Sequence, residues 1–167
     1  MGKDKALLEV GGRPMAAIAA AALRDAGATD VFAVGGDQAA LEDLGLRWVA
    51  DGAPGEGPLG AIITALQVTT TDLVAVLACD LPAVTAAAVR QVVDGADGDG
   101  AIAQAGGRVH PLLAAYRRSC LQSLRTAFDA GERAVRRALD DLTIIEVALD
   151  DPAWATNVNR PDDVAFL

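Results

Sequence analysis

Six short apolar runs, separated by helix-forming segments, constrain this chain more than any other feature. The runs are VFAVGG at 31–36, LRWVA at 46–50, LVAVLACD at 73–80, GAIAQ at 100–104, PLLAAY at 111–116 and TIIEVAL at 143–149. The central runs have no polar face, so strands built from them must be covered on both sides. Strands that alternate with helices in this way predict an α/β three-layer sandwich with a mostly parallel sheet.

The segments between the runs supply the helices. Pro14 is typical of a first helical residue and Gly27 of a helix end, which predicts a helix over 14–26. Further helices are expected over 38–44, 59–68, 84–96, 117–130 and 133–141, and Pro161 marks a short C-terminal one. No repeat or linker divides the 167 residues, which indicates a single domain over 1–167.

Charge and composition exclude several classes of function. The net charge of −9 and the aromatic content of 4% argue against a nucleic-acid surface, which needs positive charge and stacking side chains. Cys79, Cys120 and the sole histidine, His110, lack the spacing of a zinc site or disulfide framework. Without a signal peptide or an 18-residue apolar span, we expect a cytoplasmic protein that does not bind membranes.

Asp80 is the first candidate site residue. It follows a strongly apolar run, so it should lie at the carboxyl end of a strand, where ligands bind in open α/β sheets. A rigidly placed carboxylate there can hold Mg²⁺ together with substrate phosphates. Capping of the following turn or helix is the alternative.

The loop DGAPGEGPLGA at 51–61 is the second candidate. Its four glycines let the backbone approach a ligand closely, and its end opens a helix whose free N–H groups attract anions. A plain solvent loop would have the same composition. Lys3 and Lys5 are the only lysines in the chain, which suggests that an ammonium group is needed near residue 5, although terminal lysines are commonly just solvated.

Taken in order, MGKDKALLEVGGRP, VGG, DGAPGEGPLGAIITAL, ACDLP, HPLLAAY and NVNRPDD resemble the molybdenum cofactor guanylyltransferase family. That family belongs to the nucleotidyltransferases with a Rossmann-like sandwich. The resemblance implies transfer of GMP from GTP to molybdopterin cofactor with release of pyrophosphate, and Mg²⁺ as cofactor. Molybdoenzymes or cofactor-delivery proteins are further partners that it suggests.

The resemblance also implies roles for particular residues. Lys5 would contact the nucleotide phosphates, and Asp80 would bind Mg²⁺ and nucleotide. Gly35, where the family can carry asparagine, and Asp51 would border the guanosine pocket. Asn157 and Asn159 would lie on the acceptor side, next to Arg160 where threonine is common.

In this family a strand and a glycine-rich loop precede the MG.DK segment, so the domain is N-terminally incomplete relative to the family. We expect that a methionine inside the loop was taken as the start or that an upstream segment is omitted. A true loss would weaken nucleotide binding, because the loop wraps the triphosphate. A sheet without this interior strand would expose two unpaired edges.

Two other functions remain open from the sequence. A cytidylyltransferase acting on the same cofactor would differ only in a few atoms of the base pocket. A non-catalytic nucleotide-binding domain would fit the absence of the triphosphate loop.

Overall fold

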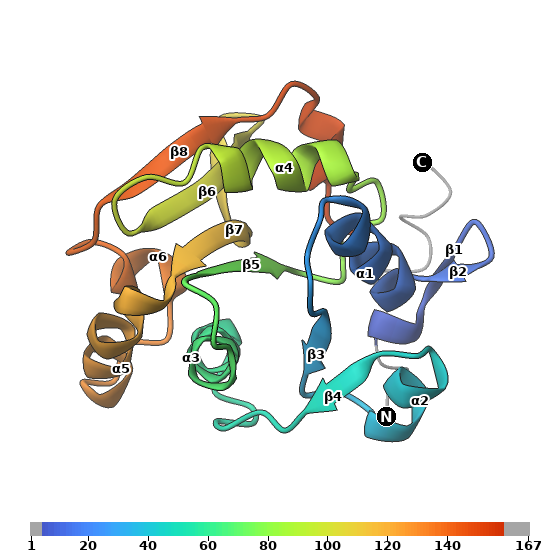
Figure 1. The fold of residues 1–167 in the computed structure, drawn as a ribbon, viewed down its shortest axis with the longest axis horizontal. Coiled ribbons are helices and arrows are strands. Elements are labelled where there is room, and N and C mark those ends of the chain that lie inside the picture. The colour runs from blue at the N-terminus through green and yellow to red at the C-terminus, as the bar shows by residue number, and fades with distance from the viewer. Residues whose placement is uncertain (1–4, 159–167) are drawn as a thin grey trace.

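A computed structural model describes residues 5–158 as a layered α/β fold (Figure 1). The strands are β1 (Glu9–Val10), β2 (Arg13–Pro14), β3 (Phe32–Val34), β4 (Arg47–Val49), β5 (Leu73–Leu77), β6 (Gly100–Ala105), β7 (Arg108–Arg117) and β8 (Ile144–Ala148). The α-helices are α1 (Met15–Asp25), α2 (Gln38–Asp43), α3 (Pro58–Val68), α4 (Ala86–Asp94), α5 (Leu121–Asp129) and α6 (Val135–Ala138). Three 3-10 turns, η1 (Lys5–Leu7), η2 (Arg118–Cys120) and η3 (Pro152–Ala155), complete the described elements.

The larger sheet has the strand order β5-β7-β6-β8. Strand β7 is antiparallel to both of its neighbours, whereas β6 and β8 are parallel, so β5, β6 and β8 run in one direction. Helices α1 and α4 pack on one face of this sheet, and α3, α5 and α6 pack on the other. The predicted three-layer sandwich is confirmed, with β7 as the reversed strand.

Strands β3 and β4 form a separate parallel pair, in which Ala33 is opposite Trp48. Among residues 5–158, no strand pairing joins this pair to the larger sheet. In Figure 1 the pair lies beyond β5, on the side away from β7. Among these residues, the sheet is therefore divided between β3 and β5.

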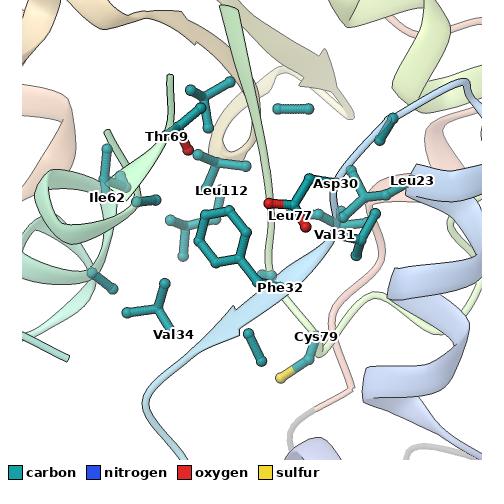
Figure 2. Close-up of a pocket in the computed structure, with 18 of the residues that line it drawn as sticks. Leu23, Asp30, Val31, Phe32, Val34, Ile62, Thr69, Leu77, Cys79 and Leu112 are labelled. Carbon is teal, nitrogen blue, oxygen red and sulfur yellow. The ribbon is translucent and has the colours of Figure 1, made fainter. Parts of the chain in front are cut away.

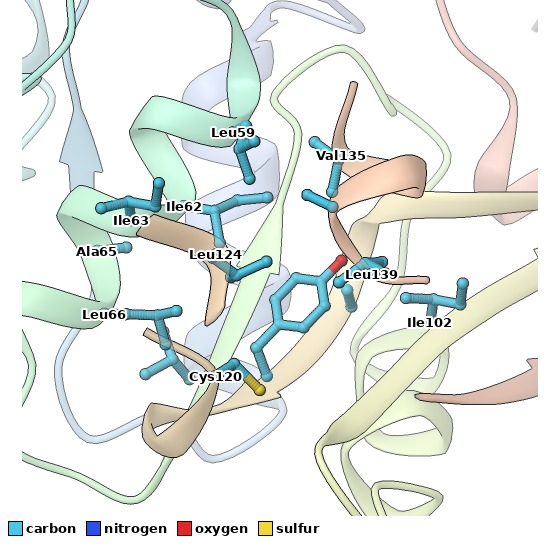
Figure 3. Packing of buried hydrophobic residues seen from close by; sticks show 14 residues of the cluster. Leu59, Ile62, Ile63, Ala65, Leu66, Ile102, Cys120, Leu124, Val135 and Leu139 are labelled. Atoms are coloured by element: carbon cyan, nitrogen blue, oxygen red, sulfur yellow. The ribbon is translucent and has the colours of Figure 1, made fainter. Parts of the chain in front are cut away.

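The main core lies between the larger sheet and the helices α3, α5 and α6. Leu59, Ile62 and Leu66 of α3 face Leu124 of α5, and all four are almost fully buried (Figure 3). The hydroxyl of buried Tyr116 donates a hydrogen bond of 2.7 Å to the carbonyl of Pro111, and burial raises its pKa. Apolar runs without a polar face thus become strands covered on both sides.

Gly100 permits a close contact between β6 and β7. A Cβ placed on Gly100 would lie 2.3 Å from the carbonyl oxygen of Ala115, and the residue has a φ of +150°. Both features exclude an ordinary L-residue, because the contact atom is backbone and cannot move aside.

The hairpin closes through Gly106 and Gly107, which both have the positive φ that two-residue hairpin turns need.

Element boundaries differ from the sequence-based expectation in a few places. The run at 73–80 is strand only as far as Leu77. The helix expected over 117–130 begins at Leu121, because Arg117 still pairs with Leu73 in the sheet and residues 118–120 form a 3-10 turn. The helix expected over 133–141 shortens to Val135–Ala138, and the helix expected at Pro161 lies outside the described residues.

Within residues 5–158, none of the helices combines the length and the apolar character that a membrane crossing requires.

Candidate functional site

The carboxyl ends of β3 and β4 bring Gly35 and Asp51 together. A Cβ placed on Gly35 would lie 3.4 Å from the Cβ of Asp51, so the two residues are close neighbours. The Trp48 indole N–H donates to the carbonyl of Gly35 at 3.0 Å, which holds the turn after β3 in place. Gly35 has a φ of +70°, so an asparagine there would occupy the left-handed region that asparagine tolerates.

The loop at 51–57 starts with a local hydrogen bond and ends at an uncapped helix. At its start, Asp51 Oδ1 accepts from the backbone N–H of Ala53 at 2.9 Å. At its end, Gly57 precedes α3 with a φ of +88°, and no side chain caps the helix. The first N–H groups of an 11-residue helix are therefore left for solvent or a ligand, which is the arrangement that binds anions.

Thr64 is a buried polar residue that sequence reasoning missed. Its hydroxyl accepts from the N–H of Gly52 at 3.1 Å and donates to the carbonyl of Gly60 at 3.0 Å. The side chain is 5% exposed and is the one buried polar residue among those described. It fastens the start of the loop to the first turns of α3. The sequence signal that could have indicated this role is a threonine in the middle of a mostly apolar helix.

Replacing this hydroxyl should destabilise the protein. For Thr64→Val we expect the free energy of unfolding to fall by about 1–3 kcal/mol, because the N–H of Gly52 loses its partner. The matched control is Thr126→Val, since Thr126 makes the same bond to a carbonyl four residues earlier but is exposed. Urea unfolding followed by circular dichroism measures both. Equal losses of stability in the two variants would show that the hydrogen bond with Gly52 does not add to the free energy of unfolding.

Arg133 connects the same loop to the segment after α5. Its Nε donates to Glu56 at 2.6 Å, its Nη1 donates to the carbonyls of Phe128 and Glu132 at 2.8 Å, and its guanidinium stacks 3.9 Å above the Phe128 ring. The partners Glu56 and Arg133 are 77 positions apart, so local sequence patterns do not reveal this bridge.

Asp80 lies three residues after the end of β5 and is half-buried. Its Oδ1 is buried and has no hydrogen-bond partner among the described residues. It is not the side-chain cap of the next helix, because Thr85 caps α4 by accepting from the N–H of Ala88 at 3.3 Å. A buried carboxylate oxygen without a partner is costly, which fits a group that binds a ligand.

Asp80 has no companion cation ligands of this kind among residues 5–158. In the described part of the chain, no three side chains of histidine, cysteine, aspartate or glutamate are grouped to hold a metal ion. Mg²⁺ commonly uses only one or two carboxylates and completes its shell with water and substrate phosphates. The donor set around Asp80 therefore fits a shared ion rather than a preformed metal centre.

Lys5 and Asn157 both come near Asp80 through their neighbours. Ala6, next to Lys5, and Cys79, next to Asp80, pack in one hydrophobic cluster. Val158, which follows Asn157, donates its N–H to the carbonyl of Asp80 at 2.8 Å. Lys5 and Asn157 themselves are exposed, and Asn159 lies outside the described residues.

Comparison with known proteins shows the family of this chain. Residues 1–145 match the family of the MobA-like NTP transferase domain. A relative from Chloroflexus aggregans, named probable molybdenum cofactor guanylyltransferase, is 35% identical over 99% of this chain and 86% of its own length.

Two solved structures share the fold. The molybdopterin-guanine dinucleotide biosynthesis protein A of Archaeoglobus fulgidus aligns with a TM-score of 0.78 and 23% identity, over 99% of this chain and 89% of its own. The 2-C-methyl-D-erythritol 4-phosphate cytidylyltransferase of Thermus thermophilus aligns with a TM-score of 0.74 and 21% identity, over 97% and 91%. From the sequence matches, the chain belongs to the MobA-like NTP transferase family, among the molybdenum cofactor guanylyltransferases.

Proposed function

We propose that this chain transfers GMP from GTP to the terminal phosphate of molybdopterin cofactor and releases pyrophosphate. The observation that carries the catalytic assignment is the buried Oδ1 of Asp80, just after β5, which has no hydrogen-bond partner among residues 5–158. The names of the relatives supply the donor and the acceptor. Because GTP is the donor, we place the reaction in the cytoplasm.

The proposed reaction needs charge neutralisation more than proton transfer. An oxygen of the acceptor phosphate forms a bond to the α-phosphorus of GTP, and the bond from that phosphorus to the bridging oxygen of the β-phosphate breaks. The second pKa of a phosphate monoester is about 6, so the attacking oxygen is already ionised at neutral pH. The enzyme must therefore bring two polyanions together and offset their repulsion.

Different residues of the site would neutralise the phosphates and position the two substrates. Asp80 would hold Mg²⁺, which supplies positive charge to the phosphates when it is bound. Lys5 would place an ammonium beside the nucleotide phosphates, and the open N-terminus of α3 adds a partial positive charge. The neighbouring residues Gly35 and Asp51 would border the base, and Asn157 and Asn159 would face the acceptor.

The alternative is that the chain uses CTP. It is supported by the fold, because a cytidylyltransferase has the same fold. The choice of base depends on a few atoms around Gly35 and Asp51. The second alternative is a non-catalytic nucleotide-binding domain. It would not explain why the chain keeps the Oδ1 of Asp80 buried.

Nucleotide titration separates these functions. We expect calorimetry to show GTP binding that requires Mg²⁺, is lost in EDTA and is tighter than CTP binding. Tighter binding of CTP would move the chain to the cytidylyl alternative. Binding of GTP without pyrophosphate release in the presence of molybdopterin would identify a non-catalytic domain.

A further inference from the structure

The Arg133 side chain is held from several directions at once. Its Nε donates to Glu56 Oε2 at 2.6 Å, and its Nη1 donates to the backbone carbonyls of Phe128 and Glu132, both at 2.8 Å. Its Cζ lies 3.9 Å from the centroid of the Phe128 ring, which is within the range of a cation–π interaction. Because the guanidinium is already fixed by these other contacts, little further entropy is lost when it pairs with Glu56.

The backbone that carries Arg133 is itself braced by Glu132. One carboxylate oxygen of Glu132 accepts from the N–H groups of Arg133 at 2.8 Å and Ala134 at 2.7 Å. The other oxygen accepts from Nε of Arg137 at 2.6 Å. The hydrogen bond from Arg137, followed by the one from the N–H of Ala134, lowers the pKa of Glu132 to about 2. The carboxylate therefore keeps its charge, and this brace persists, throughout the neutral range of pH.

The Phe128 ring also packs on the first turns of α3. A Cβ placed on Gly60 would lie 2.9 Å from the Cβ of Ala53 and 3.6 Å from Cε2 of Phe128. The missing side chain at Gly60 thus lets the loop and the ring approach the helix together. The loop at 51–57 is therefore held on α3 at two points, at Ala53 by Gly60 and at Glu56 by Arg133.

These two points lie on the opposite side of α3 from a cavity of about 740 Å³ (Figure 2). The cavity is lined by one stripe of the helix, made of Pro58, Ala61, Ile62 and Ala65. Gly60 lies about 200° around the helix from Pro58, at about 100° per residue. Within the described chain, residues 51–57 and 128–133 contribute nothing to the lining of this cavity. The loop is thus held from the side of α5.

The charge of Glu56 stands in a sensitive place. Glu56 lies two residues before Pro58, where α3 begins, and no side chain caps that helix. The N-terminus of a helix attracts a carboxylate for the same reason that it attracts a phosphate. A released Glu56 side chain would therefore compete with an anionic ligand for the open N–H groups of α3. In the structure its carboxylate is instead paired with Arg133.

We propose that Arg133 is a positioning residue for the anion site at the start of α3. By holding Glu56, it keeps the loop at 51–57 in place and keeps the Glu56 carboxylate away from the N–H groups that a ligand phosphate would use. The inference rests on the proposed function for the identity of the ligand, which is taken to be the triphosphate of GTP. The order of the loop does not depend on the reaction.

Two substitutions separate the loosening of the loop from the release of a competing charge. Glu56→Gln loosens the loop but leaves no carboxylate to compete, whereas Arg133→Gln loosens the loop and frees the carboxylate. We expect the KM for GTP to rise about two- to threefold in Glu56→Gln and about tenfold in Arg133→Gln. In both variants kcat should stay within about twofold of the parent, because neither side chain touches the reacting atoms. The double variant should return to the KM of Glu56→Gln.

Hydrogen exchange reports the order of the loop without any substrate. The N–H of Ala53 is bonded to Asp51 at 2.9 Å and the N–H of Glu56 to the carbonyl of Ala53 at 3.1 Å. Both amides should exchange about threefold faster in Glu56→Gln and in Arg133→Gln.

Arg47→Gln is the matched control. Arg47 pairs with Asp30 at 2.6 Å and its Cζ lies 4.4 Å from the centroid of the Phe32 ring, so it makes the same kinds of contact as Arg133. It stands at the start of β4, whereas the loop at 51–57 follows the end of that strand. This variant should change neither the exchange of the loop amides nor the KM for GTP.

Several results would overturn the proposal. One is a double variant whose KM stays as high as that of Arg133→Gln, since the Glu56 carboxylate would then not be the competitor. Another is unchanged exchange of the loop amides in Arg133→Gln. A third is faster exchange across the whole chain, which would give Arg133 a merely structural role.

Failure of the proposed function is distinguishable from failure of this inference. If the folded parent does not bind GTP, calorimetry with inorganic pyrophosphate and Mg²⁺ replaces the kinetic assay. Affinity that falls in the order parent, Glu56→Gln, Arg133→Gln would still support the role of Arg133. Any other order, or no binding of pyrophosphate by the folded parent, would overturn it.

Discussion

Asp80→Asn should lower kcat for pyrophosphate release about 10²- to 10³-fold while the protein remains folded. The amide is nearly isosteric with the carboxylate but carries no charge, so it would hold Mg²⁺ and the phosphates poorly. Because Oδ1 of Asp80 is buried without a partner among the described residues, removing its charge should not reduce the free energy of unfolding. Steady-state assays with GTP and molybdopterin, paired with urea unfolding, measure both effects.

The control for this variant is Asp43→Asn, an exposed aspartate at the end of α2. It should change neither kcat nor stability. A kcat of Asp80→Asn within a few fold of the parent would remove Asp80 from the catalytic site. A loss of stability in place of activity would assign the carboxylate a structural role.

Gly100→Ala should be the most damaging single methyl addition in the described chain. The new Cβ would meet the carbonyl oxygen of Ala115 at 2.3 Å and the Cα of Tyr116 at 3.1 Å, in the middle of the larger sheet. Overpacking and an unfavourable φ each cost about 1–3 kcal/mol, so we expect a loss of about 2–6 kcal/mol. Because small domains have only about 5–15 kcal/mol of stability, this loss would remove a large share of the free energy of unfolding.

Gly106→Ala provides the matched control. Gly106 also has a positive φ, +55°, but a Cβ there would meet nothing within 4 Å. Its cost should be only the strain of the left-handed conformation, about 1–2 kcal/mol. Urea unfolding compares the two variants, and similar losses would show that β7 can move away from β6 at Gly100.

The sequence predicted the fold class because apolar runs and their spacing are local signals. The hairpin of β6 and β7 was also expected, since Gly106 and Gly107 stand between two apolar runs. The ends of elements were less predictable because they depend on pairing between distant strands. Arg117, for example, stays in β7 because Leu73 lies opposite it.

From the sequence, only those residues of the candidate site that belong to local motifs could be predicted. Gly35 and Asp51 follow consecutive apolar runs, and the structure brings them close together. Whether they, Lys5, Asp80 and Asn157 act as the resemblance implies stays a prediction, and Asn159 lies outside the described residues. Thr64 escaped notice because its role depends on a loop contact 12 positions away. Arg133 could be acceptor-binding or structural from the sequence, and its bridge to Glu56, 77 positions away, has no local signal.

The division of the sheet between β3 and β5 has a consequence for cooperativity. Ala6, Ala16, Leu41 and Leu46 form a small cluster around β3 and β4, whereas the larger sheet is held by two clusters of its own. No strand pairing links these regions in the described residues, so the packing of side chains, including those of Phe32, Val34 and α3, contributes to their coupling. Regions connected mainly by packing can open as separate folding units with different free energies of opening. The loop at 51–57 connects the two units, so its order depends on their staying closed together.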